Sequence, residues 1–336
     1  MDARTIVEII VLVIVGTLIF LYLLLVPIAA LVGGRSLKNL SDEKDKLEAR
    51  NAVRQTLIQA AGGLLLAGTL AASAIAAKQA YENLDAQRDA QITDRYAKAV
   101  DQLGNKDPSV RAAAMFALAR VSQDSERDRD TIIQAISAFA RSNSPRPVSQ
   151  EEMKRQRGDR PRADILAAMI ALGRINLQGE ARRLRLDEVY LVNANLRAIQ
   201  LPKALFHRAN LAGLDASGSS TNLRNVDFSE AILTCANLSW ADISSNSLKD
   251  GGSVNRTNLR YAILTGANLQ NAKLQGALMR GARLDYANLR GADLSDVKGL
   301  KASQLEKAFI DDKTKLPESI GEVTPYDGGG YKCWKI

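Results

Sequence analysis

The sequence predicts a solenoid of roughly square cross-section, preceded by two membrane-spanning helices and a small all-α subdomain. Three observations predict this architecture: a large apolar residue at every fifth position from Leu186 onward, two long uncharged runs near the N-terminus, and a composition with 46% apolar but only 5% aromatic residues. A disordered chain does not carry so large an apolar fraction. The length of 336 residues suggests about two domains.

The first uncharged run predicts a membrane helix within residues 1–34. No charged residue lies between Glu8 and Arg35, and residues 9–32 are rich in Ile, Leu and Val. As a helix this run would be about 36 Å long at about 1.5 Å per residue, which is enough to cross a hydrocarbon core of about 30 Å. The run is too long for the apolar region of a secretory signal, so we expect an uncleaved span.

A second, softer uncharged run lies between Arg54 and Lys78 and predicts a span within residues 55–84. Small residues four positions apart let helix backbones approach closely in lipid. The run contains two such pairs, which make a candidate contact with the first span or with another copy of the chain: Gly63 with Ala67, and Gly68 with Ala72. A buried helix of a soluble protein is the alternative, because an alanine-rich run inserts only marginally.

The charges around these runs leave the topology open. The segment 35–54, expected to be a charged helical loop, carries six basic residues, namely Arg35, Lys38, Lys44, Lys46, Arg50 and Arg54. The positive-inside rule then places this loop in the cytoplasm and both chain ends outside. The same loop also contains four acidic residues, and its charges can equally form a solvated helix face. Low cysteine use and the lack of a cleavable signal favour a cytoplasmic C-terminal domain instead.

The middle of the chain predicts helices followed by a linker. Ile92, Tyr96, Val100 and Leu103 form one apolar stripe in a helical subdomain at residues 85–142. Asp107 and Pro108 provide an N-cap and a first-turn proline for a second helix, and residues 107–114 are weakly HEAT-like, with a plain helical spacer as the alternative. Residues 143–180 form a basic linker and a short helix; the linker either contacts anionic lipid head groups or is solvated.

The five-residue periodicity is the strongest signal in the chain. Its in-register core positions are Leu186, Leu191, Leu196, Leu201, Phe206, Leu211, Leu223, Phe228, Leu233, Leu238, Ile243, Leu248, Leu259, Leu264, Leu269, Leu274, Met279, Leu284, Leu289 and Leu294. Two residues before each position the residue is mostly Ala, and Asn or Asp often lies between. A period of five forms no stripe on a helix and changes face on a strand. The chain must therefore turn once per repeat, with four repeats in a coil and each large residue on the common axis.

These repeats resemble the pentapeptide-repeat family, whose consensus is A-(D/N)-L-x-x. The resemblance implies a right-handed quadrilateral β-helix over residues 181–298, with about five coils rising about 24 Å at about 4.8 Å per coil. We expect the two slips in register, Ala212–Asn222 and Lys249–Asn258, to be protruding loops. Residues 299–336 should form a capping helix at Ala302–Phe309 and a tail, which would block end-to-end stacking of solenoids.

The sequence offers no catalytic, cofactor-binding or metal site. Two cysteines cannot form a disulfide framework or a four-thiolate zinc site, and one histidine cannot supply a multi-histidine metal centre. We expect His207 to be a lone surface residue, Cys235 to face outward or lie in a turn, and Cys333 to lie in a Gly-rich tail with no base beside it. An enzyme is therefore not expected.

The function favoured by the sequence is that of a membrane-anchored, non-enzymatic scaffold, with the lipid bilayer and an unknown protein as partners. The helices before the repeats, at residues 91–104 and 117–121, resemble a bacterial arrangement, so we expect a multi-pass protein of the bacterial plasma membrane. Family members that imitate DNA and protect topoisomerases need an acidic surface, but residues 181–298 carry fifteen basic and ten acidic residues. Nucleic acid is not expected as a partner, because aromatic stacking residues are sparse and no recognition motif is present. The alternatives are a topoisomerase or nucleic-acid ligand and a membrane sensor or defence effector.

Overall fold

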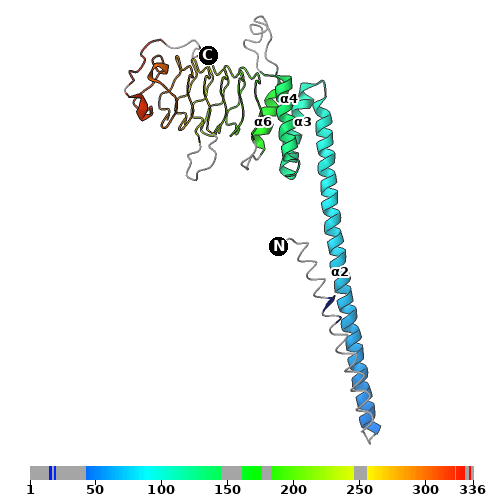
Figure 1. Cartoon of the computed structure of the whole chain (residues 1–336). Coiled ribbons are helices and arrows are strands. Elements are labelled where there is room, and N and C mark those ends of the chain that lie inside the picture. Colours follow the sequence, from blue (N-terminus) through cyan, green and yellow to red (C-terminus); the bar gives the residue numbers. More distant parts are fainter. Residues whose placement is uncertain are drawn as a thin grey trace. The chain divides into compact units, whose positions relative to one another are not determined.

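The computed structural model divides the chain into two units, residues 1–91 and 92–336. It describes Val15, Gly16, Ile19 and residues 43–144, 161–175, 183–245, 256–321, 323–329 and 333. The helices are α2 (Glu43–Leu103), α3 (Pro108–Asp124), α4 (Arg129–Asn143) and α6 (Ala163–Arg174), with 3-10 turns at Ala302–Gln304 and Glu318–Ile320 (Figure 1). A stack of coils follows α6 (Figure 1).

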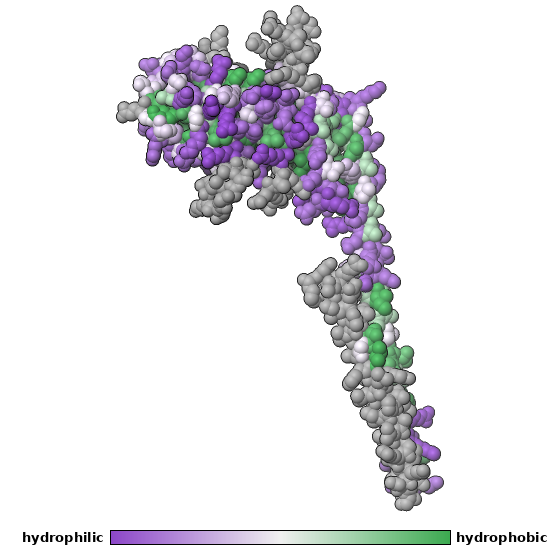
Figure 2. Space-filling view, in the orientation of Figure 1, coloured by the Kyte–Doolittle hydropathy of each residue, from purple (hydrophilic) through white to green (hydrophobic). Residues whose placement is uncertain are grey.

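Helix α2 is continuous over 61 residues and includes the second uncharged run. Among the described residues it is the one helix long and apolar enough to cross a membrane, a criterion of length and composition only. None of its most apolar window is buried, and Leu65 and Leu66 are 73% and 69% exposed. Figure 2 shows hydrophobic surface along part of α2. The first predicted span lies outside the described residues apart from Val15, Gly16 and Ile19.

Three helices, α3, α4 and α6, pack against one another. Helix α3 begins where the sequence indicates, because the Asp107 carboxylate accepts a hydrogen bond from the Ser109 backbone N–H at 2.8 Å and Pro108 occupies the first turn. Met115, Leu118 and Leu172 are fully buried between the helices. Helix α6, expected as a short helix after the linker, packs on both α3 and α4 and completes this layer.

The coils are held together by parallel backbone pairing. Asn268 pairs with Asn288 twenty residues later, so each regular coil has four sides of five residues. The Leu269 N–H donates to the Asn288 carbonyl at 2.8 Å, and the Asn288 N–H donates to the Ala267 carbonyl at 2.9 Å. At the corner, the Asn268 side-chain oxygen accepts from the Gln270 N–H at 3.1 Å, a local bond of the kind that makes Asn common in turns. The repeats therefore form a β-helix solenoid.

The expected core positions lie inside this solenoid. Those that the structure describes are at most 3% exposed, while Leu248 lies outside the described residues. The alanines two positions earlier, such as Ala267 and Ala292, are fully buried. The aromatic rings of Phe206 and Phe228 stack with centroids 5.4 Å apart. The interior is thus a column of large apolar side chains, mostly aliphatic, that alternate mainly with alanine.

The predicted protruding loop at Ala212–Asn222 is wrong. Asp215 pairs with Asn195 in one neighbouring coil and with Asn237 in the other, and Ala216 faces the core with 1% exposure. The extra residues form a compact turn that the Thr221 N–H closes on the Gly218 carbonyl at 2.9 Å. The repeat continues here with Ala in place of a large core residue. In the second slip, residues 246–255 lie outside the described residues.

The predicted capping helix at Ala302–Phe309 is also wrong. Only Ala302–Gln304 is helical, as a single 3-10 turn. Phe309 instead pairs with Asn288, since its N–H donates to the Ala287 carbonyl and its carbonyl accepts from the Leu289 N–H, both at 2.8 Å. Extended backbone at Phe309 is needed to satisfy these groups, so the segment adds to the solenoid instead of leaving it.

Helices α4 and α6 cover the N-terminal end of the solenoid. The Arg141 guanidinium donates to the Arg185 carbonyl at 2.6 Å, and the Ser144 hydroxyl accepts from the Tyr190 N–H at 3.4 Å. A Cβ added at Gly173 on α6 would lie 2.8 Å from the side chain of Ile199. One hydrophobic core runs from Ile92 to Ile310. The helical layer therefore protects an edge that would otherwise offer unpaired backbone groups.

Candidate interaction surface

Positive charge on the outer surface of the solenoid is concentrated in its C-terminal coils. Residues 183–245 carry six basic and six acidic residues, whereas residues 256–301 carry eight basic and three acidic residues. The visible surface of the solenoid is mainly hydrophilic (Figure 2). The net positive charge of the repeats is thus a local feature of the last coils.

The last coils contain a basic hollow, lined by Arg260, Tyr261, Leu278, Arg280, Lys298 and Gly299, with a volume of about 430 Å³. Its two arginines lie in adjacent coils, because the Leu259 N–H donates to the Leu278 carbonyl at 2.8 Å and the Tyr261 N–H donates to the Arg280 carbonyl at 3.0 Å. Lys298 lies one coil further along, paired with Leu278. Three cationic side chains from three coils therefore border one cavity.

No ion pair between described residues neutralises Arg260, Arg280 or Lys298. Elsewhere on the solenoid, cations do pair: Arg208 with Glu230 at 2.8 Å and Lys315 with Asp293 at 3.0 Å. Like charges on neighbouring strands repel each other, and the repulsion is relieved when an anion lies between them. The hollow is therefore suited to an anionic group.

The aromatic wall of the hollow depends on a glycine in the next coil. The ring of Tyr261 lies over Gly281, where an added Cβ would be 2.6 Å from the ring Cδ1 atom. Gly281 also has a φ of +69°, in the left-handed region that favours glycine. Tyr261 itself is 53% exposed. The ring is thus held against the backbone while one face stays accessible to a ligand.

The solenoid also places His207 beside Ser229, a contact that the sequence analysis missed. The two residues occupy equivalent positions in adjacent coils, and His207 Nδ1 lies 2.9 Å from Ser229 Oγ. The Ser229 hydroxyl donates to Asp227 at 2.6 Å, so its oxygen accepts from the histidine N–H. A serine whose proton is held by a carboxylate in this way is not activated by the histidine as a base. The described residues include no group of three or more side chains suited to a metal ion.

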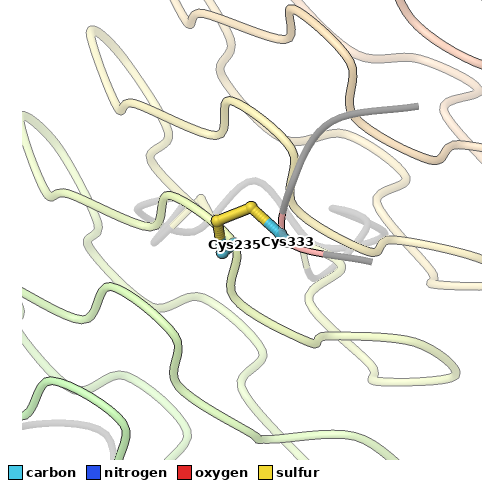
Figure 3. Close-up of a disulfide and its surroundings, with 2 residues drawn as sticks. All are labelled: Cys235 and Cys333. Atoms are coloured by element: carbon cyan, nitrogen blue, oxygen red, sulfur yellow. A yellow bond between two sulfur atoms is a disulfide. The ribbon is translucent and has the colours of Figure 1, made fainter. Parts of the chain in front are cut away.

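A disulfide joins Cys235 to Cys333, ninety-eight residues later (Figure 3). The Cα atoms are 5.4 Å apart, within the usual range for a disulfide. Sequence analysis missed this pairing because Cys333 lies outside the repeats and no periodic pattern relates it to Cys235. The expectation that Cys235 occupies a turn is met, since it has a φ of 61° at a corner of the coil.

The repeats match a known family. The profile of pentapeptide repeats matches eight copies within residues 219–248 and 255–298. These two segments are pentapeptide repeats. No curated protein matches the chain.

Several solved structures are similar to this chain over about two fifths of its length. The protein Rfr23 of the cyanobacterium Cyanothece 51142 is 25% identical, with 41% of this chain and 67% of that chain covered and a TM-score of 0.15. HetL of Nostoc sp. strain PCC 7120, which is involved in heterocyst differentiation regulation, is 26% identical. The match covers 40% of this chain and 69% of HetL, with a TM-score of 0.23. A pentapeptide repeat protein of the Arabidopsis thaliana thylakoid lumen is 25% identical. The match covers 41% of this chain and 79% of that protein, with a TM-score of 0.19.

Proposed function

We propose that this protein is a membrane-anchored, non-enzymatic scaffold whose solenoid binds a partner protein through the basic hollow. The observation that carries the proposal is the set of three cations around that hollow, none of which forms an ion pair with another described residue. A carboxylate-rich segment of a partner would complement them, and guanidinium groups hold carboxylates with paired hydrogen bonds. The flat ring of Tyr261 adds an apolar contact of the kind enriched in protein interfaces.

Membrane anchoring is supported by the exposed apolar part of α2. The uncharged stretch 55–77 would be about 35 Å long as a helix at about 1.5 Å per residue, which matches a hydrocarbon core of about 30 Å. Leu64, Leu65, Leu66 and Leu70 are exposed along it, an arrangement that is unfavourable in water and favourable in lipid. Residues 9–32 would supply a second span, and the small residues from Gly63 to Ala72 a contact between spans.

Affinity capture from solubilised bacterial membranes tests the scaffold proposal. The full chain is compared with Arg260→Glu/Arg280→Glu, and with Arg197→Glu/Lys273→Glu as a control with the same change in net charge away from the hollow. We expect a partner that remains after nuclease treatment, is lost with the first pair and is retained with the control. Equal recovery with both pairs would rule out the hollow as the contact, and loss on nuclease treatment would indicate nucleic acid instead.

A further inference from the structure

We propose that the solenoid lies in an oxidising compartment, outside the cytoplasm, and that the Cys235–Cys333 disulfide is a strap that holds the C-terminal tail against one corner of the coils. The location of the solenoid rests on the membrane anchoring proposed above. The strap rests on the positions of the two cysteines and does not depend on the anchor.

Cys235 lies at a regular corner of the coils. Backbone hydrogen bonds place Gly213 and Gly266 at the same corner on either side, through Gly213 N–H to Thr234 and Cys235 N–H to Thr265. Its φ of 61° is shared by other non-glycine corner residues, such as Trp240 and Tyr286. The backbone at Cys235 is therefore that of an ordinary corner, and the bond to Cys333 is what distinguishes it.

The tail is held at a second point on the same corner. The ring of Tyr326 meets those of Tyr286 and Phe309 edge to face, with centroids 5.9 and 5.4 Å apart. Tyr286 occupies that corner in the coil after Gly266. This position follows from the Gly266 N–H, which donates at 2.9 Å to the carbonyl of Asp285, the residue just before Tyr286. The tail therefore contacts the corner at Tyr286 by ring packing and at Cys235 by a covalent bond. Two independent contacts on one line of the solenoid indicate a docked strap.

A disulfide of this kind indicates the compartment. Its formation breaks two S–H bonds, makes one S–S bond and transfers two electrons and two protons to an oxidised dithiol protein or small disulfide, which leaves as two thiols. Cytosolic thiol systems reverse this reaction, whereas the bacterial periplasm sustains it. Both cysteines of the chain are used, so the structure contains no free thiol among its cysteines.

The loop charges agree with this location. The six basic residues of segment 35–54 place that loop in the cytoplasm by the positive-inside rule. If α2 crosses the membrane from this loop, its C-terminal end, and with it the solenoid, lies on the opposite side. The expectation of a cytoplasmic C-terminal domain rested on low cysteine use and on the lack of a cleavable signal. The pairing of the two cysteines removes the first argument, and an uncleaved span that crosses the membrane makes the second neutral.

Thiol trapping in the full chain tests the strap. Cells expressing the protein are quenched in acid, and thiols are alkylated with a maleimide–polyethylene glycol reagent, with and without prior reduction. We expect no added mass before reduction and two additions after it, whereas Cys235→Ser and Cys333→Ser each accept one addition before reduction. Two additions to the native chain before reduction, or a disulfide-linked dimer on a non-reducing gel, would overturn the proposal.

Labelling of intact spheroplasts with a membrane-impermeant maleimide tests the compartment. The free Cys333 of the Cys235→Ser variant should react before lysis, and Lys44→Cys in a chain lacking both native cysteines should react only after lysis. The reverse pattern would place the solenoid in the cytoplasm and overturn the location. Carbonate extraction of membranes from the same cells tests the membrane anchoring separately. Release of a disulfide-bonded chain into the supernatant would contradict the anchoring but not the strap.

Discussion

Arg111 on α3 and Asp164 on α6 form a buried ion pair across fifty-three residues of sequence. Arg111 donates from Nε to Asp164 Oδ2 at 2.7 Å, and the Asp164 side chain is fully buried. The same guanidinium donates from Nη1 to the carbonyls of Asn105 and Lys106, at 2.5 and 2.9 Å, where the chain passes from α2 to α3. Arg162 supplies a second cation at 2.6 Å. This cluster fixes α6 and the α2–α3 connection to one another.

Replacing Asp164 by Ala should reduce the free energy of unfolding by about 3–5 kcal/mol, because it leaves the buried Arg111 without its counter-ion. Urea unfolding of the detergent-solubilised chain measures this change. The exposed pair Lys98–Asp94 provides a matched control, and Asp94→Ala should cost less than about 1 kcal/mol. An equal loss for both variants would contradict a special role for the buried cluster.

Acid should weaken the fold through Asp164 and Asp293. Burial alone would raise the pKa of Asp164, but hydrogen bonds from Arg162 and Arg111 outweigh it and hold that pKa below the ordinary 3.8. The pKa of Asp293 is also lowered: burial alone would raise it, but hydrogen bonds from Ser295 and Lys315 outweigh the effect of burial. A carboxyl whose pKa is lower when folded stabilises the fold above its unfolded pKa and loses that contribution as the pH falls through its folded pKa.

The midpoint of thermal unfolding should therefore be nearly constant from pH 7 to about pH 5 and fall below about pH 4. Circular dichroism of the full chain in detergent measures it across that range. The Asp164→Asn variant should start from a lower midpoint and show a shallower acid decline. An acid decline as steep as that of the native chain would show that other groups cause it.

The core of the solenoid could be predicted from sequence because each side of a coil has five residues, so the buried large residue recurs at every fifth position. The periodicity of large residues does not identify core positions that hold a small residue. Ala216 faces the core, but an alanine at that position does not stand out in the sequence as a large apolar residue would. The proximity of Arg260 and Arg280 could have been predicted from the sequence, since residues twenty positions apart occupy equivalent positions in successive regular coils. The Cys235–Cys333 bond and the Arg111–Asp164 pair were not, because each joins a repeat or helix to a segment with no periodic relation to it.

Size should decide which substitutions the solenoid interior tolerates. Leu269→Ala removes a fully buried side chain and should cost about 2–5 kcal/mol in the free energy of unfolding. Ala267→Leu should also destabilise, by about 1–3 kcal/mol or more, because the fully buried alanine lies where two sides of the coil meet. Gln270→Ala, on the exposed side of the same coil, is the control and should change the value by less than about 0.5 kcal/mol. Tolerance of Ala267→Leu would contradict close packing at the small positions.

Reduction should destabilise the native chain but not a chain without the disulfide. The bond closes a segment of ninety-eight residues, and a native disulfide typically contributes about 2–4 kcal/mol by restricting the unfolded chain. We expect dithiothreitol to lower the midpoint of thermal unfolding of the native protein to the value of Cys333→Ser, and to leave that variant unchanged. Tyr326→Ala serves as a companion variant: it removes the ring contacts of the tail while keeping both cysteines, so it should remain sensitive to the reductant. A midpoint of the native chain that does not respond to dithiothreitol would mean that the strap adds nothing to the stability of the solenoid.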